Sequence, residues 1–134
     1  MPVKGIHHVG VAVEDVDGVV ELYRRLFGAE LEERELLEEQ GVEAASLLVG
    51  DSRIELLGAL GPETPVGKFL ADRGPGMHHV AFAVDDVGDE LRRLAAGGTE
   101  LVDSSPRRGA FGTTVAFVHP HAAAGVLAEL VSNG

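Results

Sequence analysis

The chain has 134 residues, of which 45% are hydrophobic and 25% charged, and this is enough for one globular domain with its own core. It contains no cysteine, which excludes disulfides, iron–sulfur clusters and thiolate zinc sites. A formal net charge of −11 argues against nucleic acid or an anionic membrane surface as a partner, and the lack of a long apolar run or a signal peptide predicts no membrane association and a cytoplasmic protein.

In the first half, a strand over residues 7–13 precedes a helix over 15–27, which Asp15 or Asp17 can cap and Gly28 can end. Strands follow over 29–33, 42–49 and 53–57, with a turn at 50–52. The acidic stretch 30–39 is typical of a solvated loop or strand edge. A connecting segment, 61–76, holds a short helix that Thr64 can cap and Pro65 can begin.

The second half repeats this order, with a strand at 78–84, a helix over 86–96 and strands at 100–103, 113–118 and 126–131. Each half therefore reads β-α-β-β-β, which predicts an α+β fold of two tandem modules around a curved-sheet cleft. We expect one domain, 1–134, with module one at about 4–60 and module two at about 77–134. Nine apolar residues are predicted to face inward from the two helices: Val16, Val19, Val20, Tyr23, Phe27, Val87, Leu91, Leu94 and Ala95.

One histidine in each first strand stands apart from the helix-facing residues. Alternation along the strand puts His8 on the same face as Gly10 and Ala12, and it puts His79 in the same position in the repeat, beside Ala81. Small neighbours leave room for a ligand. The adjacent histidines, His7 and His78, face the helix side, where packing or a hydrogen bond is the favoured role.

The last strand of each half carries a lone carboxylate, Glu55 or Glu129, inside an apolar run. A single Glu in a strand usually faces water, and a single His is seldom a ligand, but four matched positions in a repeat are not independent accidents. A buried carboxylate needs a cation or hydrogen-bond donors. We therefore predict one metal held by His8, Glu55, His79 and Glu129, and these donors suit zinc, cobalt, manganese, iron or nickel.

The chain resembles the glyoxalase/vicinal-oxygen-chelate superfamily and, within it, the methylmalonyl-CoA epimerase family, over nearly its whole length. The resemblance implies the same four ligands, with Gln in some relatives where Glu55 stands. It also implies one divalent ion (cobalt, zinc, manganese or nickel), an acyl-CoA substrate and a homodimer. The segments that carry it are 7–13, 39–42, 54–57, 64–70, 76–82, 109–112, 115–120 and 125–130.

Such an epimerase removes the proton between a thioester and a carboxylate and returns one on the opposite face, which generally requires two acid–base groups. Glu129 is one candidate. Some relatives place a second Glu where this chain has Ala44, and the neighbouring Glu43 replaces it only if the strand shifts or bulges. Two further departures, at Phe111 and His121, replace a family His and Lys.

Because coenzyme A is anionic, cationic groups should frame the site, and surface solubility is the alternative role for each of them. The candidates are Lys68, Arg107, Arg108, His119 and His121. Two other functions remain open on the same scaffold: a glyoxalase I-like lyase, and a ligand-binding protein without activity. An extradiol dioxygenase is less favoured because its two His and one carboxylate would leave Glu55 unexplained.

Overall fold

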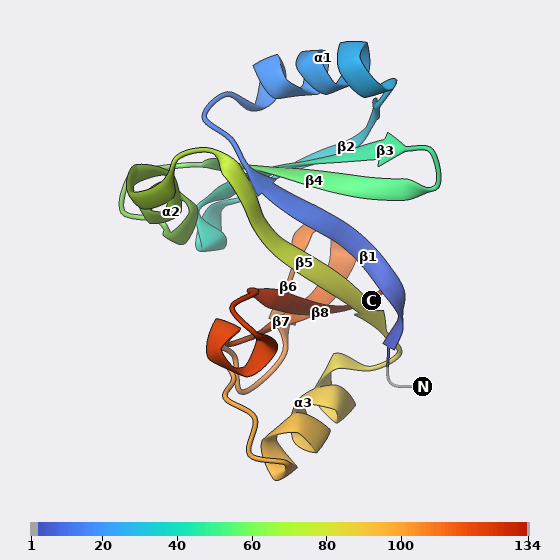
Figure 1. Cartoon of the computed structure of the whole chain (residues 1–134), viewed down its shortest axis with the longest axis vertical. Helices are drawn as coiled ribbons and strands as arrows, with labels where there is room; N and C mark the ends of the chain where they lie inside the picture. Colours follow the sequence, from blue (N-terminus) through green and yellow to red (C-terminus); the bar gives the residue numbers. More distant parts are fainter. Residues whose placement is uncertain (1–2, 134) are drawn as a thin grey trace. The chain divides into compact units, whose positions relative to one another are not determined.

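The computed structural model describes residues 3–133 and confirms an α+β fold built from a β-α-β-β-β repeat (Figure 1). No helix in this part of the chain is long and apolar enough to cross a membrane. The first repeat consists of β1 (Val3–Ala12), α1 (Val16–Phe27), β2 (Glu30–Leu37), β3 (Val42–Val49) and β4 (Ser52–Ala59). After α2 (Pro65–Arg73), the second repeat consists of β5 (Gly76–Val84), α3 (Val87–Ala96), β6 (Arg107–Arg108), β7 (Thr113–Val118) and β8 (Ala128–Asn133).

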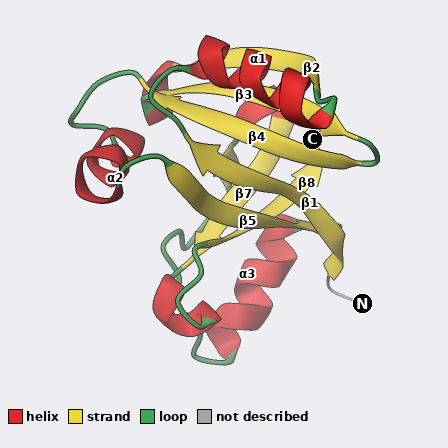
Figure 2. Cartoon of the chain, turned by 45° about the horizontal axis from the view of Figure 1, so that its top comes forward, coloured by secondary structure: helices red, strands yellow, loops and turns green. Residues whose placement is uncertain are grey.

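The described residues form two compact units, and the first of them comprises residues 8–78. Its strands lie in the order β2-β3-β4-β1, with antiparallel pairs except for β4 and β1, which are parallel. The helix α1 covers one face of this sheet (Figure 2). Six buried residues form the core between them: Val13, Val16, Ala29, Ala45, Leu47 and Leu56.

The predicted ends of α1 are confirmed, but the prediction that its last residue, Phe27, faces inward is wrong. Asp15 accepts a hydrogen bond from the backbone N–H of Gly18 at 3.2 Å, and Gly28 ends the helix with φ 70°. Phe27 is 59% exposed. It is the last residue of the helix, and its ring packs edge-on against Tyr23, at 5.4 Å, instead of joining the core.

The second unit comprises residues 3–7 together with 79–133, and its strands β5-β8-β7-β6 carry α3 on one face. Asp86 caps α3 by accepting from the N–H of Asp89 at 2.9 Å. Ala95 is exposed, contrary to prediction, because Leu94 is the residue of this last turn that packs on the core. The buried core residues are Val84, Val87, Leu91, Ala116, Val118, Ala128 and Leu130.

Two strand boundaries in the second unit differ from prediction. The strand expected over 100–103 is a single bridge from Leu101 to Val118, because Asp103 turns its carboxylate to accept from the N–H of Phe117 at 2.8 Å. The short strand β6 pairs with β7 in its place. The last strand begins at Ala128 rather than Val126, whose N–H closes a turn onto the carbonyl of Ala123 at 3.1 Å.

Candidate metal centre

The first unit brings His8 and Glu55 together; we call these two residues the first pair. They lie on the parallel strands β1 and β4, whose register sets Gly10 opposite Glu55. Because His8 and Gly10 face the same side of β1, the histidine ring lies beside the carboxylate. The Nε2 of His8 is 3.5 Å from Oε2 of Glu55, and the two side chains are 4% and 13% exposed.

The second unit repeats this arrangement with His79 and Glu129, the second pair. On the parallel strands β5 and β8, Ala81 lies opposite Glu129. The Nε2 of His79 is 3.2 Å from Oε1 of Glu129, and the side chains are 3% and 9% exposed. The same ring nitrogen therefore meets a carboxylate in both pairs, and each carboxylate faces a residue with almost no side chain.

Within each pair, the geometry fits two ligands of a metal ion. Two ligand atoms about 2.1 Å from a metal are separated by about 3.0 Å at a right angle and about 3.4 Å at the tetrahedral angle. The observed separations of 3.5 and 3.2 Å are close to this range. Three of the four side chains, His8, His79 and Glu129, are buried, and all three are of types that could hold a metal ion.

The carboxylates differ in their second neighbour on the sheet. Opposite Glu55 on β3 lies Ser46, which is 3% exposed. The Ser46 hydroxyl donates to Oε1 of Glu32 at 3.1 Å, and Arg53 donates to both oxygens of Glu32 at 2.9 and 3.0 Å. These hydrogen bonds raise the pKa of Arg53 above its ordinary value. We call Glu32, Ser46 and Arg53 the Ser46 network.

Opposite Glu129 on β7 lies Phe117, an aromatic residue. Its ring meets the ring of His79 edge-on at 5.5 Å, and the guanidinium of Arg107 lies 5.5 Å from the same ring. Arg107 is also 3.4 Å from Asp103. Arg107, one of the predicted substrate-binding cations, therefore contacts the same Phe117 ring as His79 of the second pair.

The Ser46 network and Phe117 were not predicted as site residues. A lone hydroxyl in the apolar strand over 42–49 was the available signal for Ser46. Glu32 had no signal, because its position beside Ser46 depends on the register in which β2 pairs with β3, and the residue pattern does not specify that register.

Glu43, the weak candidate for a second base, is not brought to the first pair. It lies three residues before Ser46 on β3 and therefore faces the opposite side of the sheet from Glu55. There it is 2.8 Å from Arg34, which also pairs with Asp17 at 2.6 Å. The strand has not shifted as this role would require, so the residue is a partner of Arg34.

The other predicted substrate-binding residues lie on the surface. Lys68 is exposed on α2, and Arg108 is exposed on β6. His119 and His121 both approach the carboxylate of Glu100, at 3.6 and 3.7 Å. The backbone N–H of His121 donates to Nδ1 of His119 at 3.1 Å, so these two histidines form a local cluster with an acidic partner.

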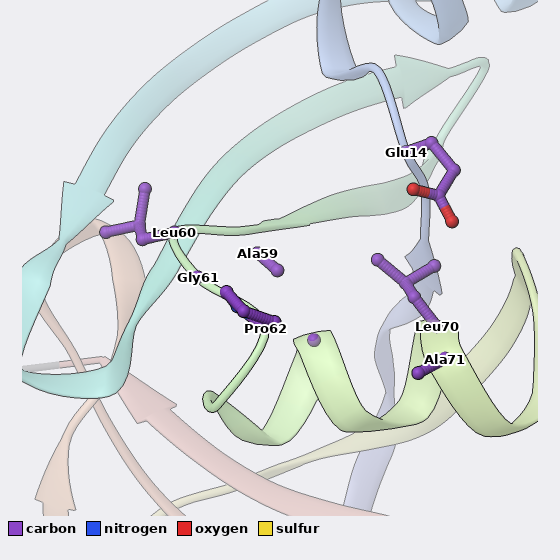
Figure 3. A pocket seen from close by; sticks show the side chains of 8 residues that line it. Glu14, Ala59, Leu60, Gly61, Pro62, Leu70 and Ala71 are labelled. Atoms are coloured by element: carbon purple, nitrogen blue, oxygen red, sulfur yellow. The ribbon is translucent and has the colours of Figure 1, made fainter.

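A hollow of about 390 Å³ lies elsewhere in the first unit, beside α2 (Figure 3). Its wall is mostly apolar, Glu14 is its single charged residue, and none of the predicted site residues lines it. The residues are Glu14, Ala59, Leu60, Gly61, Pro62, Gly67, Leu70 and Ala71.

Comparison with known proteins agrees with these features. The sequence model of the Glyoxalase/Bleomycin resistance protein/Dioxygenase superfamily matches residues 7–117. The ethylmalonyl-CoA/methylmalonyl-CoA epimerase of Cereibacter sphaeroides is 34% identical over 93% of this chain and 95% of its own. The mitochondrial methylmalonyl-CoA epimerase of Bos taurus is 35% identical over 93% of this chain and 72% of its own.

Solved structures give the same result. The crystal structure of methylmalonyl-CoA epimerase from Mycobacterium tuberculosis is 38% identical, with a TM-score of 0.95 over 99% of this chain and 90% of its own. A methylmalonyl-CoA epimerase in complex with methylmalonyl-CoA and ammonium is also 38% identical, with a TM-score of 0.94 over 98% of this chain and 96% of its own. The fold and the repeated His–Glu pairs define a member of the glyoxalase superfamily. Within it, the chain belongs to the methylmalonyl-CoA epimerase family.

Proposed function

We propose that this chain is an epimerase of methylmalonyl-CoA that uses one divalent metal ion. The observation that carries the proposal is the His–Glu pair that recurs at equivalent positions of the repeat. Relatives named as methylmalonyl-CoA epimerases match almost the whole chain, and one of them is solved with methylmalonyl-CoA bound. Both findings support an enzyme acting on an acyl-CoA ester.

His8, Glu55, His79 and Glu129 would hold the ion as ligands of a single centre, within one domain. Four donors of this kind suit cobalt, zinc, manganese or nickel. When bound, the ion would stabilise negative charge on the substrate oxygens as the proton leaves the neighbouring carbon. The pairs themselves exclude water, since three of the four residues are less than 9% exposed.

Glu129 is the residue that we assign to proton transfer. Epimerisation breaks one C–H bond and forms another on the opposite face of the same carbon, so a proton is taken up and one is returned. A carboxylate can accept the proton and give it back, and Glu129 lies on a strand lined by apolar Ala81, Val115 and Val131. Glu43 is not proposed again for the second face.

The cations Lys68, Arg107, Arg108, His119 and His121 stay candidates for binding the anionic coenzyme A. Arg107 has the strongest support, because it packs on the Phe117 ring that also meets His79. Lys68 is exposed on α2, so it too can bind a phosphate. The pairing of His119 and His121 with Glu100 weakens their case.

The test is deuterium exchange into methylmalonyl-CoA, measured by mass spectrometry with metal-depleted protein and after each candidate ion is restored. Exchange that requires both protein and metal supports the proposal. A glutathione hemithioacetal, supplied in parallel, tests the lyase alternative on the same scaffold. Turnover of that compound without exchange in the thioester would replace the epimerase by a lyase, and no reaction with either would favour a binding protein.

The homodimer and the cytoplasmic location stay predictions. We propose a homodimer because relatives commonly form one. Light scattering over a wide range of protein concentration measures the mass directly, and a monomer mass throughout would refute the dimer.

A further inference from the structure

The two pairs are equivalent in the repeat, yet their carboxylates have different neighbours. Glu129 lies opposite Phe117, which has no hydrogen-bonding group on its side chain. Glu55 lies opposite Ser46, a buried hydroxyl. A hydroxyl beside a metal ligand matters because it can donate a hydrogen bond to the ligand oxygen, whose lone pairs also bind the ion.

The Ser46 hydroxyl donates its hydrogen bond to Glu32. The Oγ of Ser46 donates to Oε1 of Glu32 at 3.1 Å, and at 3% exposure it has little access to water. Directly opposed residues of an antiparallel pair have Cβ atoms about 4.5–5.5 Å apart. Without Glu32, the carboxylate of Glu55 would therefore be the nearest anionic acceptor on the facing strand.

Two separate features hold Glu32 in this role. Leu31 on β2 pairs with Leu47 on β3, so the next residue, Glu32, lies beside Ser46, at the point where the register shifts between Leu31 and Glu33. Arg53 donates hydrogen bonds to both carboxylate oxygens, at 2.9 and 3.0 Å, and this bidentate geometry fixes the orientation of the carboxylate. The Glu32 side chain is only 26% exposed, although β2 is an edge strand.

We propose that Glu32 is a positioning residue for the metal ligand Glu55, an inference that rests on the metal centre proposed above. By accepting the hydrogen bond from the Ser46 hydroxyl, Glu32 leaves only lone pairs of the Ser46 oxygen on the side of the first pair. The oxygens of Glu55 then stay available to a cation. The second pair needs no such residue, because Phe117 has no proton to direct.

The experiment measures Co²⁺ binding to metal-free protein by calorimetry and by the visible absorption of the bound ion. Glu32→Ala lets the Ser46 hydroxyl donate to Glu55 and so lowers the donor strength of that carboxylate. Co²⁺ binding should then weaken about tenfold and the absorption should change, since changes around the ligands of a metal commonly have effects of this size. Ser46→Ala should have little effect. In the Ser46→Ala background, Glu32→Ala should cause no further loss, because no hydroxyl proton remains to be redirected.

The matched control is Glu30→Ala, which removes the same charge from an exposed position of the same strand and should leave binding unchanged. Arg53→Gln keeps the acceptor and should cost less than Glu32→Ala, and it serves if Glu32→Ala does not fold. An equal loss in both backgrounds, or no loss with Glu32→Ala, would overturn the inference. If the unmutated chain binds no Co²⁺, the proposed metal centre falls as well.

Discussion

Replacing Glu129 by Gln separates the role of this residue as a ligand from its role as a base. The side chain is 9% exposed, and its Oε1 lies 3.2 Å from Nε2 of His79. Gln has nearly the same shape and keeps one oxygen, which can take the place of Oε1 and still coordinate an ion. The amide nitrogen then takes the place of the other oxygen and cannot accept a proton at neutral pH.

The two roles predict losses of different size. Exchange of an anionic for a neutral donor should lower metal affinity by about 10- to 100-fold, similar to losses from other changes at metal sites. Excess metal restores occupancy against such a loss. Removal of a base lowers the rate by about 10²–10⁴-fold and is not restored by metal. We therefore expect Glu129→Gln, when saturated with metal, to retain at most about a hundredth of the exchange rate.

The assay is deuterium exchange into methylmalonyl-CoA over a metal titration, and Glu55→Gln is the control. Glu55 is the repeat-equivalent residue, and some relatives carry Gln at its position, so this variant should stay active once metal is added. If both variants lose the same fraction of activity and both recover with added metal, Glu129 is a ligand only. The base would then be another residue.

Four further predictions concern stability and metal binding. Leu56→Ala, at a position with 0% exposure, should lower the free energy of unfolding by about 2–5 kcal/mol in a denaturant titration. Asp15→Ala removes the cap of α1 and should cost about 1 kcal/mol by the same measurement, while an unchanged midpoint would show that the cap bond contributes nothing. Metal at a hundred times its Kd should stabilise the chain by about 2.7 kcal/mol, so a chelator should lower Tm and added metal should restore it. Ala81→Val, at 0% exposure opposite Glu129, should lower the affinity for metal by more than its effect on the Tm of the metal-free chain accounts for. A fall in Tm with an unchanged metal affinity would contradict the idea that this small residue makes room for an ion.

Sequence patterns predicted those features that depend on local chemistry or on the repeat. Asp15 and Thr64 cap their helices as expected, because capping needs only a side-chain oxygen a few residues from a free N–H. Each His–Glu pair was predicted because the two halves carry the same residues at the same places. The alternation of faces along β1 and β5 then places each histidine on the predicted side.

The features that were missed depend on register and tertiary contacts. Glu32 reaches Ser46 because β2 pairs with β3 in the register that sets Leu31 opposite Leu47, and the residue pattern does not specify that register. Glu43 was a reasonable base by proximity in sequence, but its parity on β3 sends it to Arg34. The strand expected at 100–103 is replaced by a hydrogen bond that the backbone N–H of Phe117 donates to the Asp103 carboxylate, which strand propensity cannot predict.

Each His–Glu pair joins the first and last strands of its module, and this has a consequence for folding kinetics. Parallel pairing between strands so distant in sequence closes a long loop and is a slow, late kind of contact. An ion bound across such a contact stabilises the native state more than the transition state for folding. Metal should therefore slow the unfolding of this chain far more than it speeds refolding, so the bound ion would increase the kinetic stability of the chain.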